Sequence, residues 1–134
     1  MTKLSVFILL VVALLSALSL IFGASYLDAK LVGGLPVGNV LTAIVLCAGS
    51  CAAIGLSTRG SALRSISVMA FVLAAAWLPL SIALAGNLEL NFSGTQGDIW
   101  ILCTLSILTL VLAALLWAVV LSGYNTFIRK GNRL

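Results

Sequence analysis

The chain has 134 residues, of which 63% are hydrophobic and only 7% charged, and its mean hydropathy is +1.29. Soluble domains carry about 25% charged residues, so this composition leaves too little polar surface for a water-facing globule and excludes a soluble enzyme. Disorder is excluded as well, because it requires low hydrophobicity and high charge. The formal net charge of +4 does not indicate a nucleic-acid partner, since the basic residues are scattered in short connections. The composition therefore predicts an integral membrane protein.

Four windows contain no Asp, Glu, Lys or Arg, and they cover residues 4–27, 40–57, 65–86 and 99–124. Each window is about as long as the roughly 20 residues that a helix needs to cross a bilayer, and the second is near the lower limit. A backbone in lipid must satisfy its own hydrogen bonds, and the windows show no strand alternation, so we expect helices. The sequence predicts an all-α membrane protein with one domain, 1–134, built as a compact bundle of four transmembrane helices.

Local signals refine the ends of these windows. The first window resembles a secretory signal, but its length and the bulky Phe22 near a possible cleavage site favour an uncleaved span. Gly33, Gly34 and Pro36 interrupt the first connection. Asp98 directly precedes the fourth window and is well placed as the N-cap of its helix.

The distribution of charge predicts the orientation. With the N-terminus inside, six basic residues lie on the cytoplasmic side, namely Lys3, Arg59, Arg64, Arg129, Lys130 and Arg133. The opposite side holds one basic residue, Lys30, and all the acids, Asp28, Glu89 and Asp98. Cytoplasmic ends of membrane helices are enriched in Lys and Arg. We therefore expect both termini to be cytoplasmic, in a bacterial inner (plasma) membrane.

Small residues mark the second window as a packing helix. Ala43, Cys47, Cys51 and Gly55 recur every four positions along one helix face, and Gly49 and Ala53 widen this stripe. Small residues let helix backbones approach closely, which drives association in lipid. The two cysteines would share a face, and a redox or metal site is the alternative to packing. Packing is favoured, because two thiols do not complete a metal site and burial disfavours the reactive thiolate.

Pro79 interrupts the third window. A proline inside a helix removes one backbone hydrogen bond and clashes with the preceding turn, so we expect a kink there. The alternative is a broken helix that exposes carbonyls to a binding cavity, as in transporters. The chain offers no matching second break, and the structural kink is favoured.

No residue pattern indicates chemistry. The chain has no His, the commonest general base and a frequent metal ligand, and the windows carry no charged side chain. We expect no catalytic residue, cofactor or metal site. The leading hypothesis is a non-catalytic small membrane subunit that packs against and stabilises a larger membrane protein complex, with other membrane subunits and lipids as partners. The alternative is a small homo-oligomeric channel or carrier for a neutral or apolar solute. A membrane enzyme acting on lipid ranks last.

Overall fold

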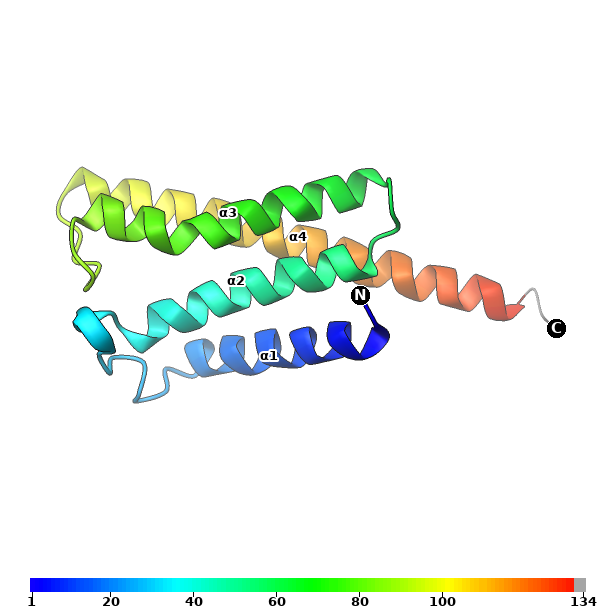
Figure 1. Cartoon of the computed structure of the whole chain (residues 1–134), viewed down its shortest axis with the longest axis horizontal. Coiled ribbons are helices and arrows are strands. Elements are labelled where there is room, and N and C mark those ends of the chain that lie inside the picture. The colour runs from blue at the N-terminus through cyan, green and yellow to red at the C-terminus, as the bar shows by residue number, and fades with distance from the viewer. Residues whose placement is uncertain (132–134) are drawn as a thin grey trace.

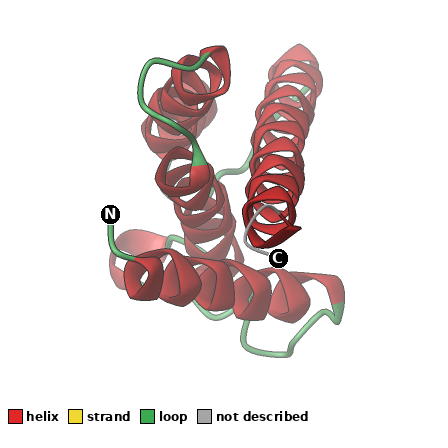
Figure 2. Cartoon of the chain, turned by 90° about the vertical axis from the view of Figure 1, so that its right-hand side faces the viewer, coloured by secondary structure: helices red, strands yellow, loops and turns green. Residues whose placement is uncertain are grey.

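The computed structural model describes residues 1–131, and the side chains of all of these except residues 32 and 129–131. It contains four long helices, α1 (Lys3–Ile21), α2 (Val37–Leu56), α3 (Ala62–Ala85) and α4 (Thr95–Gly131), and a short 3-10 turn, η1 (Val32–Gly34). Figure 2 shows helices joined by short loops. All four long helices are long and apolar enough to cross a membrane. The 20 residues of α2, for example, extend about 30 Å, which is the thickness of the hydrocarbon layer. The predicted all-α architecture with four such helices is confirmed.

The ends of these helices follow from local sequence. The Thr2 side chain accepts a hydrogen bond from the Ser5 amide and caps α1, and Ser61 caps α3 in the same way. Hydroxyl side chains favour this position because they satisfy amides that lack an intrahelical partner. Gly23 and Gly86 adopt left-handed φ values of 61° and 69° just beyond α1 and α3. Glycine favours that conformation after a helix, so α1 ends before the charge-free window does.

The fourth helix is longer than its charge-free window at both ends. It begins at Thr95 and has 37 residues, so Asp98 lies inside its first turn and the expectation that Asp98 is the N-cap was wrong. An acid in the first turn still interacts favourably with the positive end of the helix dipole. The charge-free criterion made the window too short at both ends, because a helix tolerates charged residues near its ends.

The helices are arranged around α2. Among the long helices, α2 packs against α1, α3 and α4, α3 packs against α4, and α1 packs against α2 alone. Figure 1 shows α1 along one edge of the molecule, with α2 between it and α3. Two clusters of buried residues are shared by α2, α3 and α4, one around Leu46, Trp77 and Val111 and one around Ala53 and Ala118. Val6 and Ala13 of α1 are buried as well. The arrangement is therefore more open than the compact bundle that we expected.

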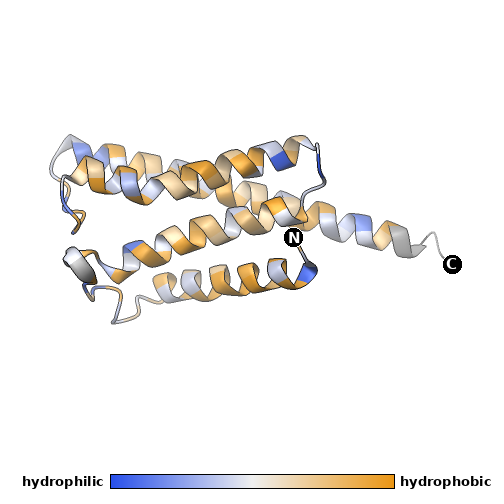
Figure 3. Cartoon of the chain, viewed as in Figure 1, coloured by the Kyte–Doolittle hydropathy of each residue, from blue (hydrophilic) through white to orange (hydrophobic). Residues whose placement is uncertain are grey.

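The hydrophilic residues lie mainly near the two ends of the molecule (Figure 3). The N-terminus, the connection between α2 and α3, and the last turns of α4 lie at one end, and the other two connections lie at the opposite end (Figure 1). Figure 3 shows apolar residues along the helices and hydrophilic ones mainly near their ends. Arg64 at the first end donates a hydrogen bond of 3.2 Å to the carbonyl of Ile54 near the end of α2. Arg133 lies outside the described residues, as do the side chains of Arg129 and Lys130.

Candidate functional site

The small residues of α2 contact three different helices. A Cβ on Gly49 would lie 3.2 Å from Val111 of α4, and a Cβ on Gly55 would lie 2.7 Å from Val6 of α1. Ala53 is fully buried with residues of α3 and α4. Gly55 thus permits the approach of α1, and Gly49 permits that of α4. These contacts lie within the chain, so at Gly49, Ala53 and Gly55 the small residues serve internal packing.

The remaining members of the stripe are half-buried. Ala43 and Cys47 pack against the cluster around Leu46 and Trp77, and Cys51 lies one turn further along α2. Both cysteines are free thiols. Within residues 1–131, no group of three His, Cys, Asp or Glu side chains lies close enough together to hold a metal ion.

Pro79 lies on the outside of α3. Its ring is exposed, and the helix runs without interruption from Ala62 to Ala85. The proline sits in the turn between Trp77 and Ser81, whose side chains are both buried. Its ring lines neither of the two cavities described below.

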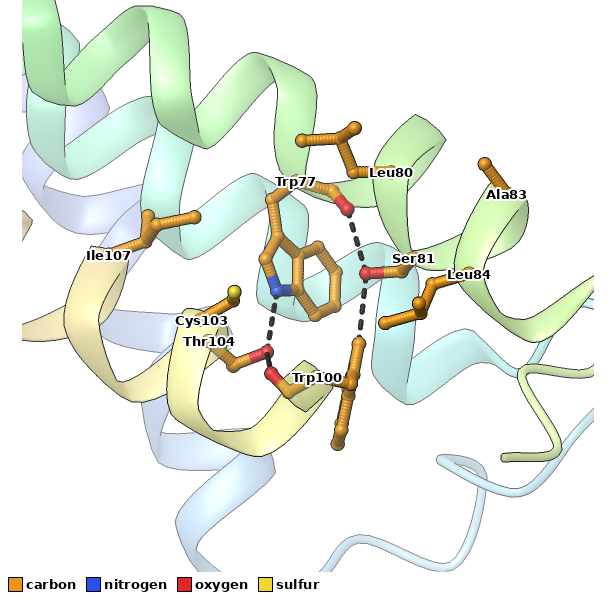
Figure 4. A pocket seen from close by; sticks show the side chains of 9 residues that line it. All are labelled: Trp77, Leu80, Ser81, Ala83, Leu84, Trp100, Cys103, Thr104 and Ile107. Atoms are coloured by element: carbon orange, nitrogen blue, oxygen red, sulfur yellow. Dashed lines mark hydrogen bonds between the residues drawn. The ribbon is translucent and has the colours of Figure 1, made fainter. Parts of the chain in front are cut away.

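Two tryptophans and two hydroxyl groups join α3 to α4 through two hydrogen-bond chains that close into a ring through the tryptophan residues, here called the Trp–hydroxyl ring. Trp77 Nε1 donates to Thr104 Oγ1 over 2.9 Å, and Trp100 Nε1 donates to Ser81 Oγ over 2.9 Å. Each hydroxyl then donates to the backbone carbonyl of the tryptophan one turn earlier in its own helix, over 2.7 Å in both cases. Figure 4 shows the four bonds. Both indole N–H groups therefore have an acceptor within the protein, and a buried donor needs such a partner because water cannot reach it.

Sequence reasoning missed this ring. It did not connect Trp77 with Trp100. The available signal is the repeated spacing of four residues, Trp77 to Ser81 and Trp100 to Thr104, which sets an indole and a hydroxyl on one face of each helix. The two indole rings are tilted by 43° with centroids 6.2 Å apart, and Phe92 stacks on Trp100 at 4.8 Å. The stacking extends the contact into the connection between α3 and α4.

A cavity of about 420 Å³ lies beside the ring, between α3 and α4. Its lining is mostly apolar and contains no charged side chain; the residues are Trp77, Leu80, Ser81, Ala83, Leu84, Trp100, Cys103, Thr104 and Ile107 (Figure 4). The hydroxyls and indoles in this lining are already paired with one another. The cavity can therefore accept an apolar group, and the free thiol of Cys103 is the one group in its lining that could act as an acid or an ion ligand.

A second cavity, of about 340 Å³, forms a groove between α1, α2 and α4. Apolar or small side chains line it throughout: Leu10, Ala13, Leu14, Ala17, Val45, Gly49, Leu108, Val111, Leu112 and Leu115. The groove exists because α1 and α4 both pack on α2 without packing on each other. We call it the α1–α4 groove.

The connections at the end opposite the N-terminus contact each other. Lys30 Nζ lies 2.7 Å from Glu89 Oε1, and Asn91 Nδ2 donates to Glu89 Oε2 over 3.0 Å. The Lys30 and Asn91 hydrogen bonds, followed by the Lys30 charge, hold the pKa of Glu89 below its ordinary value of 4.5. A Cβ on Gly34 would lie 3.1 Å from Glu89, so the two connections approach closely. The exposed salt bridge of Glu89 with Lys30 thus links the two connections.

Comparison with known proteins gave no match: no family model matches the chain, and no curated protein or solved structure is significantly similar to it.

Proposed function

We propose that this chain is a non-catalytic integral membrane subunit that packs against and stabilises a larger membrane protein complex. The observation that supports the proposal is the α1–α4 groove, which stays open because α1 packs against α2 alone. Ala13 and Ala17 of α1 line one wall. Small residues promote helix association in lipid because they let backbones approach closely. The occupant that we propose is an apolar transmembrane helix of another polypeptide.

The polar groups inside the spans support a non-catalytic role, because they are already used in packing. Ser50 and Ser67 are fully buried and donate to carbonyls one turn earlier in their own helices. Ser81 and Thr104 accept the two indole donors of the Trp–hydroxyl ring. None of these hydroxyls faces a base, and an activated nucleophile needs one within hydrogen-bond reach.

We further propose that the four helices cross a bacterial inner membrane with both termini cytoplasmic. Lys3, Arg59 and Arg64 lie near the end that carries the N-terminus, and Lys30 lies at the other end, where Glu89 pairs with it. An excess of basic residues marks the cytoplasmic side. Labelling a cysteine introduced at Arg59 with a membrane-impermeant maleimide in intact cells tests this orientation, since the proposal expects no labelling until the membrane is opened.

The subunit proposal is tested by isolating the chain from its native membrane in mild detergent, followed by native mass spectrometry. We expect the chain in a complex with a second membrane polypeptide. Ala17→Leu should fill the α1–α4 groove and abolish that association. Ala113→Leu is the matched control, because Ala113 is exposed on α4 and does not line the groove. A monomer without any second polypeptide, or equal association of both variants, contradicts the proposal.

The second candidate is a small homo-oligomeric channel or carrier for a neutral or apolar solute. The cavity beside the Trp–hydroxyl ring favours it, since that cavity has room for an apolar group and contains no charge. Protein-dependent flux of a neutral solute into reconstituted vesicles, reduced by Leu84→Trp in the cavity wall, would support this function. Vesicles that show no flux would remove it.

A further inference from the structure

The last turns of α4 extend beyond every other helix. Ala118 is the last residue of α4 in the buried core, where it packs with Ala53 and Leu63 near the ends of α2 and α3. Residues 119–131, here called the terminal segment, continue as helix past this level (Figure 1). At 1.5 Å per residue the terminal segment spans roughly 20 Å, and Phe127 lies roughly 14 Å beyond Ala118. The headgroup layer on each side of a bilayer is only about 5–8 Å thick.

The terminal segment is amphipathic, and its two faces continue the faces of α4 in the bundle. Val111, Ala114 and Ala118 form the buried face. The same helical spacing continues it with polar residues, namely Ser122 and Asn125. The outward face carries exposed apolar side chains throughout: Leu116, Val120, Tyr124 and Phe127. Phe127 is 81% exposed, so nothing in the described chain covers the apolar face at its far end.

Charge complementarity identifies what covers this face. Asp98 is the last acid in the sequence, and Arg129, Lys130 and Arg133 follow the apolar face. An apolar aromatic face followed by three basic residues favours the interface of a membrane containing anionic lipid, since each basic residue near such a surface adds to the attraction. The Ser122–Gly123 pair provides a point where the helix can bend toward the surface, because Gly and Ser pairs are common sites of helix kinks. A Cβ on Gly123 would meet no atom within 4 Å, so no neighbour opposes the bend.

We propose that the terminal segment lies on the anionic surface of the membrane that holds the bundle. Tyr124 and Phe127 insert into the interface, and the basic residues that follow them in the sequence are attracted to the anionic lipid. The proposal rests on the membrane insertion proposed above and needs no partner protein. An upright terminal segment would instead leave Phe127 in water.

The test uses the purified full chain in lipid vesicles, with a nitroxide attached at Asn125→Cys or at Phe127→Cys. Cys47, Cys51 and Cys103 are replaced by Ala so that the label has one site. These two positions lie on opposite faces of one turn, so each is the matched control of the other. Accessibility to oxygen, which concentrates in lipid, is compared with accessibility to a water-soluble nickel chelate. Vesicles of phosphatidylcholine alone are compared with vesicles that also contain phosphatidylglycerol.

We expect the label at 127 to be oxygen-accessible and the label at 125 to be nickel-accessible in vesicles with phosphatidylglycerol. The depth at 127 should decrease in phosphatidylcholine alone, and also when Arg129→Gln and Lys130→Gln are combined. Equal nickel accessibility at both positions overturns the proposal, and so does a depth at 127 that is the same in both lipids. Protection at 127 in native membranes but not in vesicles overturns it in favour of a protein partner.

A label at Leu105→Cys separates this proposal from the insertion on which it rests. Leu105 is exposed in the first third of α4, inside the charge-free window 99–124. If the chain is inserted, this label is oxygen-accessible in both lipids, whatever the terminal segment does. Nickel accessibility at position 105 would mean that insertion itself has failed, and it would overturn the surface proposal with it.

Discussion

Removing the acceptor for Trp77 should destabilise the protein more than removing the acceptor for Trp100. The side chain of Trp77 is only 3% exposed, so Thr104→Val leaves its N–H buried without an acceptor, at a cost of about 1–3 kcal/mol. The substitution preserves the volume of Thr104. Trp100 is half-buried, and after Ser81→Ala its N–H can reach water or lipid headgroups. We therefore expect a smaller loss for Ser81→Ala.

A double-mutant cycle of Trp77→Phe and Thr104→Val isolates the bond from the change in packing. Interhelical hydrogen bonds in membrane proteins contribute about 0.6 kcal/mol on average and up to about 1.7 kcal/mol. Trp77 is nearly inaccessible to water, and its acceptor Thr104 itself donates to the carbonyl of Trp100, so we expect a coupling energy in the upper half of that range. Reversible unfolding in mixed micelles of a mild detergent and dodecyl sulfate, followed by helical circular dichroism, measures each free energy of unfolding.

The matched control is Thr109→Val on the same helix. Thr109 is exposed, and its hydroxyl donates to the carbonyl of Leu105 within α4. We expect a change within about 0.5 kcal/mol, as for surface substitutions generally. Additive effects in the cycle, or a greater loss from Ser81→Ala than from Thr104→Val, would refute the argument that the ring joins α3 and α4.

Three further predictions concern other contacts. Gly49→Leu should lower the free energy of unfolding in mixed micelles by about 1–3 kcal/mol, because the leucine side chain would overpack against α4. Gly123→Leu is the control and should change this free energy little. Equal effects of the two substitutions would contradict the prediction. The stabilisation due to Glu89 is present above pH 4.5 and is lost as the pH falls through its lowered folded pKa, so Glu89→Gln should destabilise at pH 7 but not in acid, as shown by unfolding at each pH. In detergent, mass spectrometry should find Cys103, the exposed thiol, modified by a maleimide before the two thiols of α2; the opposite order would be inconsistent with the packing of α2.

The helices could be predicted from the sequence more reliably than their ends or their partners. A charge-free window of about 20 residues has one physical solution in lipid, a helix, so four helices follow from composition and position. Their ends depend on single backbone conformations, such as the left-handed Gly23 that terminates α1. Asp98 shows the opposite error, since a charge was taken as a boundary although α4 already begins at Thr95.

The contacts between helices could be predicted only in part. The small residues of α2 indicate that backbones approach there, but a stripe does not say which helix fills it. Gly55 is filled by α1 and Gly49 by α4, and this division depends on how each helix is rotated about its axis. The Trp–hydroxyl ring depends on rotation and on register at once, because Trp77 must meet Thr104 while Trp100 meets Ser81. Apolar residues lie on nearly all faces of these helices, so the hydrophobic pattern determines neither the rotation nor the register.

The position of α1 depends on contacts at both of its ends. Near its start, Val6 packs where a side chain on Gly55 would otherwise lie, and beyond its end Lys30 pairs with Glu89 after α3. No other helix within residues 1–131 packs against its remaining faces, whose apolar side chains are exposed. The α1–α4 groove is thus a consequence of α2 having small residues on several faces while α1 has one packed face. An occupant of that groove would give α1 a second packed face without rearranging the core of α2, α3 and α4.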